Sequence, residues 1–274
     1  MEMVCCSLYS GSSGNAFYIG CGDTQLLIDC GKSGRQTEEA LRFLGVEPDA
    51  LTGILVTHEH RDHIAGIGVM SRKYHIPVYA TEKTWAAIGD KVGAFPRGMQ
   101  RVFERESDFY IGGLGIVPFP VSHDAADPCG FRVYDGAVSV ALATDFGFFS
   151  KEMLLALSGA DVILLESNHD PDMVWANPHY TYALKQRILG RRGHMSNADS
   201  AEALMALADK GTRHFILGHM SQENNTPNLA LLTSETRAEL DGLENGRDLW
   251  IDRAWRDRVG NLYRLNPTGV LAHA

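Results

Sequence analysis

The sequence predicts an α/β (α+β) protein in which helices cover a mixed system of β-sheets. Strand-like segments cluster near the start of the chain, and further along strands alternate with amphipathic helical segments. No low-complexity segment, long linker or short-period repeat interrupts its 274 residues. This length suits one large core, so we expect a single domain spanning 1–274.

The expected strands share short apolar or β-branched runs bounded by turn residues. They cover 17–20, 25–28, 54–56, 78–80, 115–121, 131–134, 138–143, 162–165 and 214–217. The expected helices have apolar residues three or four positions apart. They cover 36–44, 64–74, 81–89, 151–157, 181–189 and 199–210. Ser196 and Asn197 offer an N-cap for the last of these helices.

Composition narrows the classes of protein to consider. Hydrophobic residues make up 45% of the chain and charged residues 22%, which is ordinary for a soluble globular protein. A formal charge of −9 argues against a broad nucleic-acid-binding surface but allows a local one. Two arginine clusters are candidates for a basic patch, with solvated surface side chains as the alternative: Arg97, Arg101 and Arg105, and Arg187, Arg191 and Arg192.

Targeting and cysteine patterns point to the cytoplasm. No run approaches the ~18–20 apolar residues that span a membrane, and the N-terminus lacks the features of a signal peptide. The five cysteines are odd in number and irregularly spaced, which predicts neither a disulfide framework nor a Cys-x-x-Cys zinc site.

The strongest motif is the run His58-Glu59-His60-Arg61-Asp62-His63, which directly follows an expected strand. Imidazole nitrogens and carboxylate oxygens are ligands for zinc and similar divalent ions. His58 and His60 alternate and could share one side of the loop, whereas Asp62 and His63 could face a second ion. The alternative is a polar surface loop, which does not account for so many ligand types in so short a span.

Acids and histidines also recur where other expected strands end. Six strand-like segments end in this way, and a site assembled along a common sheet edge would explain the repetition. The residues at these ends are Asp29, His58, His123, Asp145, Glu166 and His219.

With these residues in view, the chain resembles the metallo-β-lactamase superfamily over most of 4–226. The resemblance implies an αββα four-layer sandwich with a two-metal site at one edge of its sheets. It implies that His58, His60 and His123 hold the first metal, that Asp62, His63 and His219 hold the second, and that Asp145 bridges them. Asp29 would steady a ligand histidine by hydrogen bonding.

Two of these assignments have alternatives in the sequence. Asp145 could be a turn residue before Gly147, although a compact two-metal site needs a shared ligand. Gly-His-Met-Ser occurs twice, around His194 and His219. Because His219 directly follows a strand and His194 precedes a helix, we expect His219 to bind metal and His194 to serve in catalysis or phosphate binding.

Four longer motifs are similar to the YycJ/WalJ branch of the superfamily; they lie at 7–15, 166–170, 190–197 and 217–227. The resemblance implies a metal-dependent 5′-to-3′ exonuclease acting on double-stranded DNA. The chain is too short for a β-CASP insertion and lacks the long arm of tRNA 3′-processing enzymes.

The implied chemistry needs two divalent ions, with zinc or manganese favoured and iron or nickel also compatible. Such a pair lowers the pKa of a bridging water, which supplies hydroxide at neutral pH. We expect Asp62, Asp145 and His194 to act in catalysis, with His194 donating a proton or binding phosphate.

Further residues are assigned more loosely. Asn15 is expected near the metals. Ser196 and Asn197 are expected to cap a helix whose N-terminus also offers an anion-binding edge. Asn168 is expected to line the site, and His169 could line it, bind a third metal or lie at the surface. The loop 12–15 lacks the Lys and spacing of a P-loop, so no nucleotide cofactor is expected.

Other functions fit parts of the pattern. A phosphodiesterase for small, for example cyclic, substrates would use the same site, and the charge of −9 mildly favours it. Thioester, lactone or β-lactam hydrolysis would leave the motif around His194 without a purpose. A non-catalytic metal or redox protein is disfavoured because every expected ligand position is filled. The sequence leaves the oligomeric state open.

Overall fold

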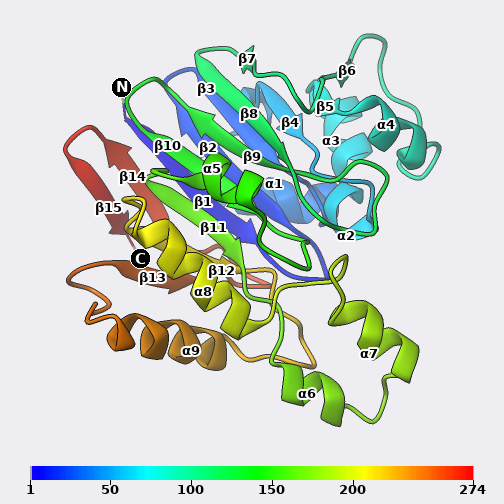
Figure 1. Ribbon diagram of the computed structural model, residues 1–274. Coiled ribbons are helices and arrows are strands. Elements are labelled where there is room, and N and C mark those ends of the chain that lie inside the picture. Colours follow the sequence, from blue (N-terminus) through cyan, green and yellow to red (C-terminus); the bar gives the residue numbers. More distant parts are fainter. Residues whose placement is uncertain (1, 274) are drawn as a thin grey trace.

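The computed structural model describes residues 2–273, which form two β-sheets packed face to face with helices on the outside (Figure 1). The first sheet has eight strands. In spatial order they are β15 (Gly269–His273), β14 (Leu262–Asn266), β1 (Met3–Tyr9), β2 (Ala16–Cys21), β3 (Thr24–Ile28), β4 (Gly53–Leu55), β5 (Val78–Ala80) and β6 (Gln100–Val102).

The second sheet has seven strands. In spatial order they are β13 (Trp250–Arg253), β12 (His214–Gly218), β11 (Val162–Glu166), β10 (Ser139–Ala143), β9 (Cys129–Tyr134), β8 (Leu114–Pro120) and β7 (Phe109–Ile111). Each sheet has an antiparallel half and a parallel half. The parallel halves are β3 to β6 in the first sheet and β10 to β13 in the second.

The helices connect these strands. They are α1 (Gly34–Phe43), α2 (Arg61–Ile64), α3 (Ile67–Tyr74), α4 (Glu82–Ile88), α5 (Lys151–Leu157), α6 (Pro171–Ala176), α7 (Tyr182–Ile188), α8 (Asn197–Ala208) and α9 (Pro227–Leu240), with a 3-10 turn at Pro48–Ala50. Ser196 caps α8 as the sequence predicts, because its side chain accepts a hydrogen bond from the Asp199 N–H.

Three apolar layers confirm the αββα sandwich. The central layer lies between the sheets and joins residues such as Phe17 and Ile28 to Phe131 and Leu142. A second layer packs the other face of the first sheet against α1 and α3, and a third packs the second sheet against α5, α8 and α9. Because strands in the middle of such a sandwich are buried on both faces, they read as continuous apolar runs in the sequence.

The structure differs from the expected elements in several places. The expected helix 64–74 is interrupted near its start: α2 ends at Ile64 and α3 begins at Ile67. The chain turns at Gly66, whose N–H donates to the Cys30 carbonyl 2.8 Å away. A Cβ at Gly66 would lie 2.5 Å from the Lys32 carbonyl oxygen, so only glycine fits this close approach. Sequence analysis also missed six strands and two helices: β1, β6, β7, β13, β14, β15, α6 and α9.

The segment after Leu229 closes the fold. Helix α9 packs on α8, while β14 pairs with β1 and extends the first sheet. All five cysteines are buried and free of disulfides, in line with their irregular spacing. None of the helices formed by residues 2–273 is long and apolar enough to cross a membrane.

Candidate metal centre

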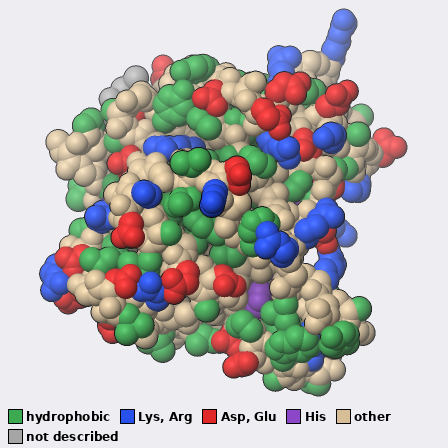
Figure 2. All heavy atoms as spheres, in the orientation of Figure 1, with side chains coloured by type: hydrophobic (Ala, Val, Ile, Leu, Met, Phe, Trp, Pro, Cys, Tyr) green, Lys and Arg blue, Asp and Glu red, His purple; other side chains and the backbone are tan. Residues whose placement is uncertain are grey.

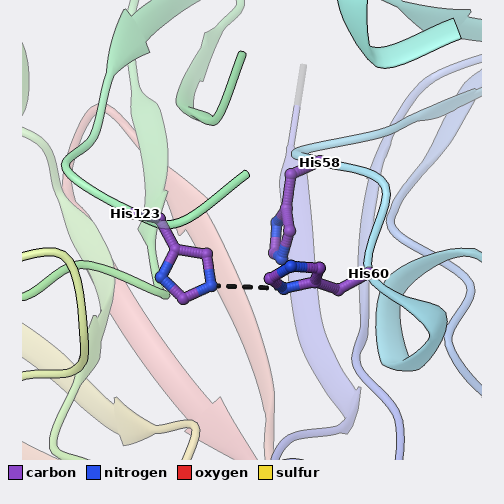
Figure 3. A group of neighbouring side chains, drawn as sticks. All are labelled: His58, His60 and His123. Atoms are coloured by element: carbon purple, nitrogen blue, oxygen red, sulfur yellow. Dashed lines mark hydrogen bonds between the residues drawn. The ribbon is translucent and has the colours of Figure 1, made fainter. Parts of the chain in front are cut away.

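Three histidines converge where β4 and β8 end (Figure 3). His58 and His60 leave β4 in the loop before α2, and His123 follows β8. One ligand nitrogen from each ring lies within 4.8 Å of the other two. His60 Nδ1 and His123 Nε2 are 3.3 Å apart, the contact that Figure 3 marks with a dashed line. The rings therefore present three nitrogens to a common point.

A second group forms from Asp62, His63 and His219, whose ligand atoms also lie within 4.8 Å of one another. Asp62 Oδ2 is 3.6 Å from His63 Nε2 and 3.7 Å from His219 Nε2. Asp62 and His63 come from α2, and His219 follows β12 in the other sheet. This group therefore spans the gap between the two sheets.

Asp145 lies between the two groups. Its Oδ2 is 3.2 Å from His63 Nε2, and its Oδ1 is 3.6 Å from His123 Nε2 and 3.5 Å from His219 Nε2. It also forms a ligand group with His58 and His63, one residue from each triad. A carboxylate in this position has the geometry of a bridging ligand.

The backbone is strained at three of the strand ends that supply the site. Asp29, Asp145 and His219 have φ of 63°, 60° and 52°. Residues other than glycine rarely adopt this left-handed region, and such strain is concentrated at functional sites. The three side chains meet at the centre: Asp29 and Asp145 both contact His63, and Asp145 lies 3.5 Å from His219 Nε2.

Each of four rings has one nitrogen held by a neighbour, which leaves the other free to face the centre. Because the held nitrogen fixes the orientation of the ring, such contacts are a recurring feature of metal-ligating histidines. The Nδ1 contacts are His58 to Thr57 Oγ1 (3.0 Å), His63 to Asp29 Oδ2 (2.7 Å), His123 to the Gly193 carbonyl (3.3 Å) and His219 to Glu166 Oε1 (2.8 Å).

Asp29 supports the first loop through several hydrogen bonds. It accepts from the Thr57 N–H and hydroxyl, each at 2.9 Å, as well as facing His63. Gly31 then lets the chain pass close to the ligand loop, because a Cβ there would lie 1.6 Å from the Asp62 carbonyl oxygen. Asn15 is also beside the centre, with Nδ2 3.1 Å from His63 Nε2.

The donor set fits divalent metal ions. His58 Nε2, Asp145 Oδ2 and His219 Nε2 are buried, and none of them makes a hydrogen bond of acceptable geometry within residues 2–273. Burying an unsatisfied polar atom costs about 1–3 kcal/mol, so three such atoms facing one point need an explanation. Coordination to a cation satisfies all three, and imidazole and carboxylate are suitable ligand types.

The carboxylates and histidines of the site shift one another's pKa values strongly. Burial raises the pKa of Asp145, but His219 and His63 outweigh it and hold that pKa well below its usual range. In the same way, burial lowers the pKa of His219, but Asp145, Asp62 and Glu166 raise it to about 10. The carboxylates are therefore ionised at neutral pH.

Glu166 is a residue whose role sequence analysis missed. It is the last residue of β11, is fully buried, and its Oε1 lies 2.8 Å from Nδ1 of both His194 and His219. Burial raises its pKa, but these two histidines lower it to about 2. The recurrence of acids at strand ends pointed to Glu166, but only the tertiary structure reveals its two partners.

His194 stands beside the metal-ligand groups with one nitrogen on Glu166. Its Nδ1 is 3.8 Å from Asp145 Oδ1, and its side chain remains 24% exposed. Burial lowers the pKa of His194, but Glu166 and Asp145 outweigh it and raise that pKa above the ordinary value. His194 is thus placed to hold a proton at the edge of the centre.

A cavity of about 200 Å³, called the catalytic cavity below, opens over the centre. Besides the candidate ligands, His194 and Asn168 line it. Tyr180 and Arg187 reach it from the α6–α7 segment, and sequence analysis gave neither a role at the centre. Arg187 Nε donates to Asp124 Oδ2 at 2.6 Å, so this arginine is not simply a solvated side chain.

Three residues expected near substrate do not line the catalytic cavity. Ser196 caps α8, and Asn197 is buried in hydrogen bonds with Ser167 and Asn225. His169 is buried, and its burial lowers its pKa to about 4. Asn168, in contrast, donates from Nδ2 to the His219 carbonyl at 2.6 Å.

The cluster Arg97, Arg101 and Arg105 does not line the catalytic cavity either. Arg105 is instead paired with Asp127 at 2.7 Å. On the face shown in Figure 2, basic and acidic side chains are interspersed rather than gathered into a continuous basic field. This distribution agrees with the net charge of −9.

Comparison with known proteins places this centre in context. The family model described as the beta-lactamase superfamily domain matches residues 24–220. Exodeoxyribonuclease YycJ of Bacillus anthracis is 39% identical over 226 residues, covering 82% of this chain and 85% of that protein. Exodeoxyribonuclease WalJ of Streptococcus pneumoniae is 41% identical over 228 residues, covering 82% and 84%.

Solved structures show the same fold at low identity. The metallo-β-lactamase fold protein YhfI from Bacillus subtilis has a TM-score of 0.71 at 16% identity, covering 95% of this chain and 99% of that one. A diphosphatase from the PhnP family has a TM-score of 0.65 at 18% identity, covering 97% and 98%.

These findings confirm the family that the sequence motifs suggest. The chain belongs to the metallo-β-lactamase superfamily, and its His/Asp clusters make it a metal-dependent hydrolase. Within that superfamily it belongs to the family of YycJ and WalJ, which it matches over most of its length.

Proposed function

We propose that this hydrolase is a two-metal phosphodiesterase that removes nucleotides from the 5′ ends of double-stranded DNA. The observation that carries the proposal is the position of Asp145 between two triads of ligand atoms. The names of the YycJ and WalJ relatives support DNA as the substrate.

In this proposal the seven ligands divide as the sequence resemblance implies. One ion would be held by His58, His60 and His123 and the other by Asp62, His63 and His219, with Asp145 available to both. We favour zinc or manganese. When bound, the ion pair would activate water near neutral pH and neutralise charge on the phosphate.

His194 supplies the proton that the leaving oxygen needs. Its Nδ1 faces Glu166, so the proton to be transferred sits on Nε2. Although burial lowers the pKa of His194, Glu166 and Asp145 raise it above its ordinary value, which favours the protonated ring that this role needs. After transfer, Glu166 continues to hold the neutral ring in the same orientation, ready for reprotonation from solvent.

Arg187 and Tyr180 bound the catalytic cavity from the α6–α7 segment. A guanidinium there can donate to a phosphate oxygen, and an aromatic ring offers a surface for a base. The Arg187 side chain is 63% exposed and forms an ion pair with Asp124. Because an exposed ion pair contributes little free energy, Arg187 can turn toward substrate at small cost.

The experiment is cleavage of duplex DNA labelled at either the 5′ or the 3′ end by manganese- or zinc-loaded protein. The proposal expects metal-dependent release of nucleotides from the 5′ end, and loss of that release in Asp145→Ala. Release starting from the 3′ end would refute the polarity, and unchanged activity in Asp145→Ala would refute the site.

A second candidate is hydrolysis of small phosphodiesters. The modest volume of the catalytic cavity, about 200 Å³, favours it because a small ester needs no extended groove. Inert DNA alongside metal-dependent turnover of bis(p-nitrophenyl) phosphate would select this candidate.

A further inference from the structure

A second cavity adjoins the catalytic cavity and contains no candidate metal ligand other than Asp62. Its volume is about 580 Å³, and both cavities are lined by Ser12 and Asp62. Lys32 and Arg61 also line it. Ser12 therefore stands at the point where the two cavities meet.

The loop that carries Ser12 and Ser13 is tied to the metal centre. Gly11 N–H donates to Asn15 Oδ1 at 2.7 Å, and Gly14 N–H donates to the Gly11 carbonyl at 2.9 Å. Asn15 N–H in turn donates to the Asp62 carbonyl at 2.8 Å. The hydroxyls of this loop are thus held at a defined place relative to Asp62, although both serines are exposed.

Two cations converge on these hydroxyls from distant parts of the chain. Lys32 Nζ donates to Ser13 Oγ at 2.9 Å, and Arg256 Nη1 donates to Ser12 Oγ at 3.4 Å. The Nη2 of Arg256 is anchored on the Met220 carbonyl at 2.7 Å, next to His219. Both cations are half-buried.

Lys32, Arg61 and Arg256 form no ion pair within the part of the chain that the structure describes. Among residues 2–273, no carboxylate oxygen lies within 4.0 Å of the charged nitrogens of Lys32, Arg61 or Arg256. Burial and the charge of Arg256 lower the pKa of Lys32, with Asp257 opposing them. Asp62 does line the cavity, but its Oδ2 faces His63 and His219. The charge of Asp257 acts on both Lys32 and Arg256, although it forms no ion pair with either among the described residues. Cations held this close together without an ion pair favour an anionic ligand.

We propose that Lys32, Arg256 and the Ser12–Ser13 hydroxyls bind a phosphate of the nucleic-acid strand next to the phosphate that is cleaved. This inference rests on the proposed function. A point-charge ammonium, a guanidinium fork and two hydroxyls are a donor set suited to the oxygens of a phosphodiester. The exposed Arg61 adds positive charge at the same cavity.

The subsite explains how an acidic protein can hold a polyanion. Binding a strand releases counterions in proportion to the phosphates contacted, so a few well-placed cations provide affinity without a broad basic surface. A polymer reaching both cavities contacts metals at one phosphate and Lys32 with Arg256 at another. A small ester fills only the catalytic cavity.

The test is the salt dependence of kcat/KM for labelled duplex DNA with the metal-loaded full chain. Lys32→Gln and Arg256→Gln are each expected to lower kcat/KM by ~10-fold and to reduce the slope of log kcat/KM against log salt by ~1. Arg256→Lys keeps the charge and should keep most of the slope. Melting temperature and bound metal verify that each variant is folded.

Lys210→Gln is the matched control. Lys210 is exposed and precedes β12, whereas His219 follows the other end of that strand. The control removes the same charge far from the subsite and should behave as the wild type. If Lys32→Gln and Arg256→Gln match Lys210→Gln while the wild type cleaves DNA, the subsite is refuted and the proposed function stands.

Turnover of bis(p-nitrophenyl) phosphate separates the remaining outcomes. Its single phosphate cannot reach both cavities. An equal fall in its turnover and in DNA cleavage would assign Lys32 and Arg256 a purely structural role and overturn the subsite. Wild-type turnover of this ester without any DNA cleavage would refute the DNA substrate, and with it the subsite.

Discussion

Glu166 Oε1 lies 2.8 Å from Nδ1 of His194, the histidine proposed as proton donor. The same oxygen lies 2.8 Å from Nδ1 of His219, a candidate metal ligand. One buried carboxylate therefore orients both the proposed proton donor and a candidate metal ligand. In the proposed mechanism, a change at Glu166 would affect metal binding and proton transfer together.

Glu166→Gln should weaken both functions at once. The amide keeps the size of the side chain but loses the charge that fixes both rings, so we expect a ~10- to 100-fold loss of metal affinity or turnover. Metal titration and steady-state kinetics measure the two effects. A variant with normal metal affinity and normal turnover would contradict the shared role of Glu166.

His194→Ala and His219→Ala should separate proton transfer from metal binding. His194→Ala is expected to lower turnover by ~10²-fold or more with metal content intact, as for loss of a general acid. His219→Ala is expected to lose metal. Elemental analysis of the purified variants measures their metal content. Loss of metal from His194→Ala with retention in His219→Ala would reverse the two assignments.

Metal binding at neutral pH should release protons. The pKa of His219 is raised to about 10 and that of His63 well above its ordinary value, mainly because nearby carboxylates outweigh burial. Both rings are therefore protonated without metal and must give up a proton to coordinate it. Calorimetry at pH 7 in buffers of different ionisation enthalpy should detect release of about one proton or more. Binding without proton release would argue against these ligands.

The metal-free protein should lose stability in acid. The pKa of Glu166 is about 2 in the folded protein, against ~4.3 for an unfolded glutamate. Its contribution is therefore present above pH ~4.3 and is lost as pH falls through about 2. Denaturant unfolding between pH 5 and 2 should show this decline, and Glu166→Gln should show less of it. If stability falls equally with pH in the wild type and in Glu166→Gln, Glu166 does not cause the acid instability.

His219 should make the metal-free protein lose stability at high pH. Its folded pKa of about 10 lies above the ordinary value of 6.5, so its contribution is present below pH 6.5 and is lost as pH rises through about 10. Metal-free wild type should therefore be less stable at pH 9 than at pH 6. His219→Gln should reduce this fall in stability between pH 6 and pH 9. An equal fall in that variant would contradict the role of His219.

The convergence of the candidate metal ligands could be predicted from the sequence for a physical reason. Parallel strands end at a common edge, so acids and histidines that follow strands such as β4, β10 and β12 are brought together by the fold itself. Asp145 and His219 both have left-handed backbone, and their side chains lie 3.5 Å apart. Short apolar runs before each residue were enough to locate these strands. The single domain over 1–274 stays a prediction.

Other parts depend on contacts that no local pattern encodes. Arg256 meets Ser12 only because the chain after β13 returns to the start of the first sheet. Tyr180 reaches the catalytic cavity because the α6–α7 segment folds over it. Strand β1 includes Cys5 and Cys6, and no turn residue precedes it. The sequence therefore contains no signal for where this strand begins.

The most direct test of the account is the anomalous diffraction of crystals grown with manganese or zinc. We expect two metal peaks, one among His58, His60 and His123 and one among Asp62, His63 and His219, with Asp145 contacting both. A single peak, or a metal coordinated by His194 in place of His219, would contradict the two-metal site on which the proposed function rests.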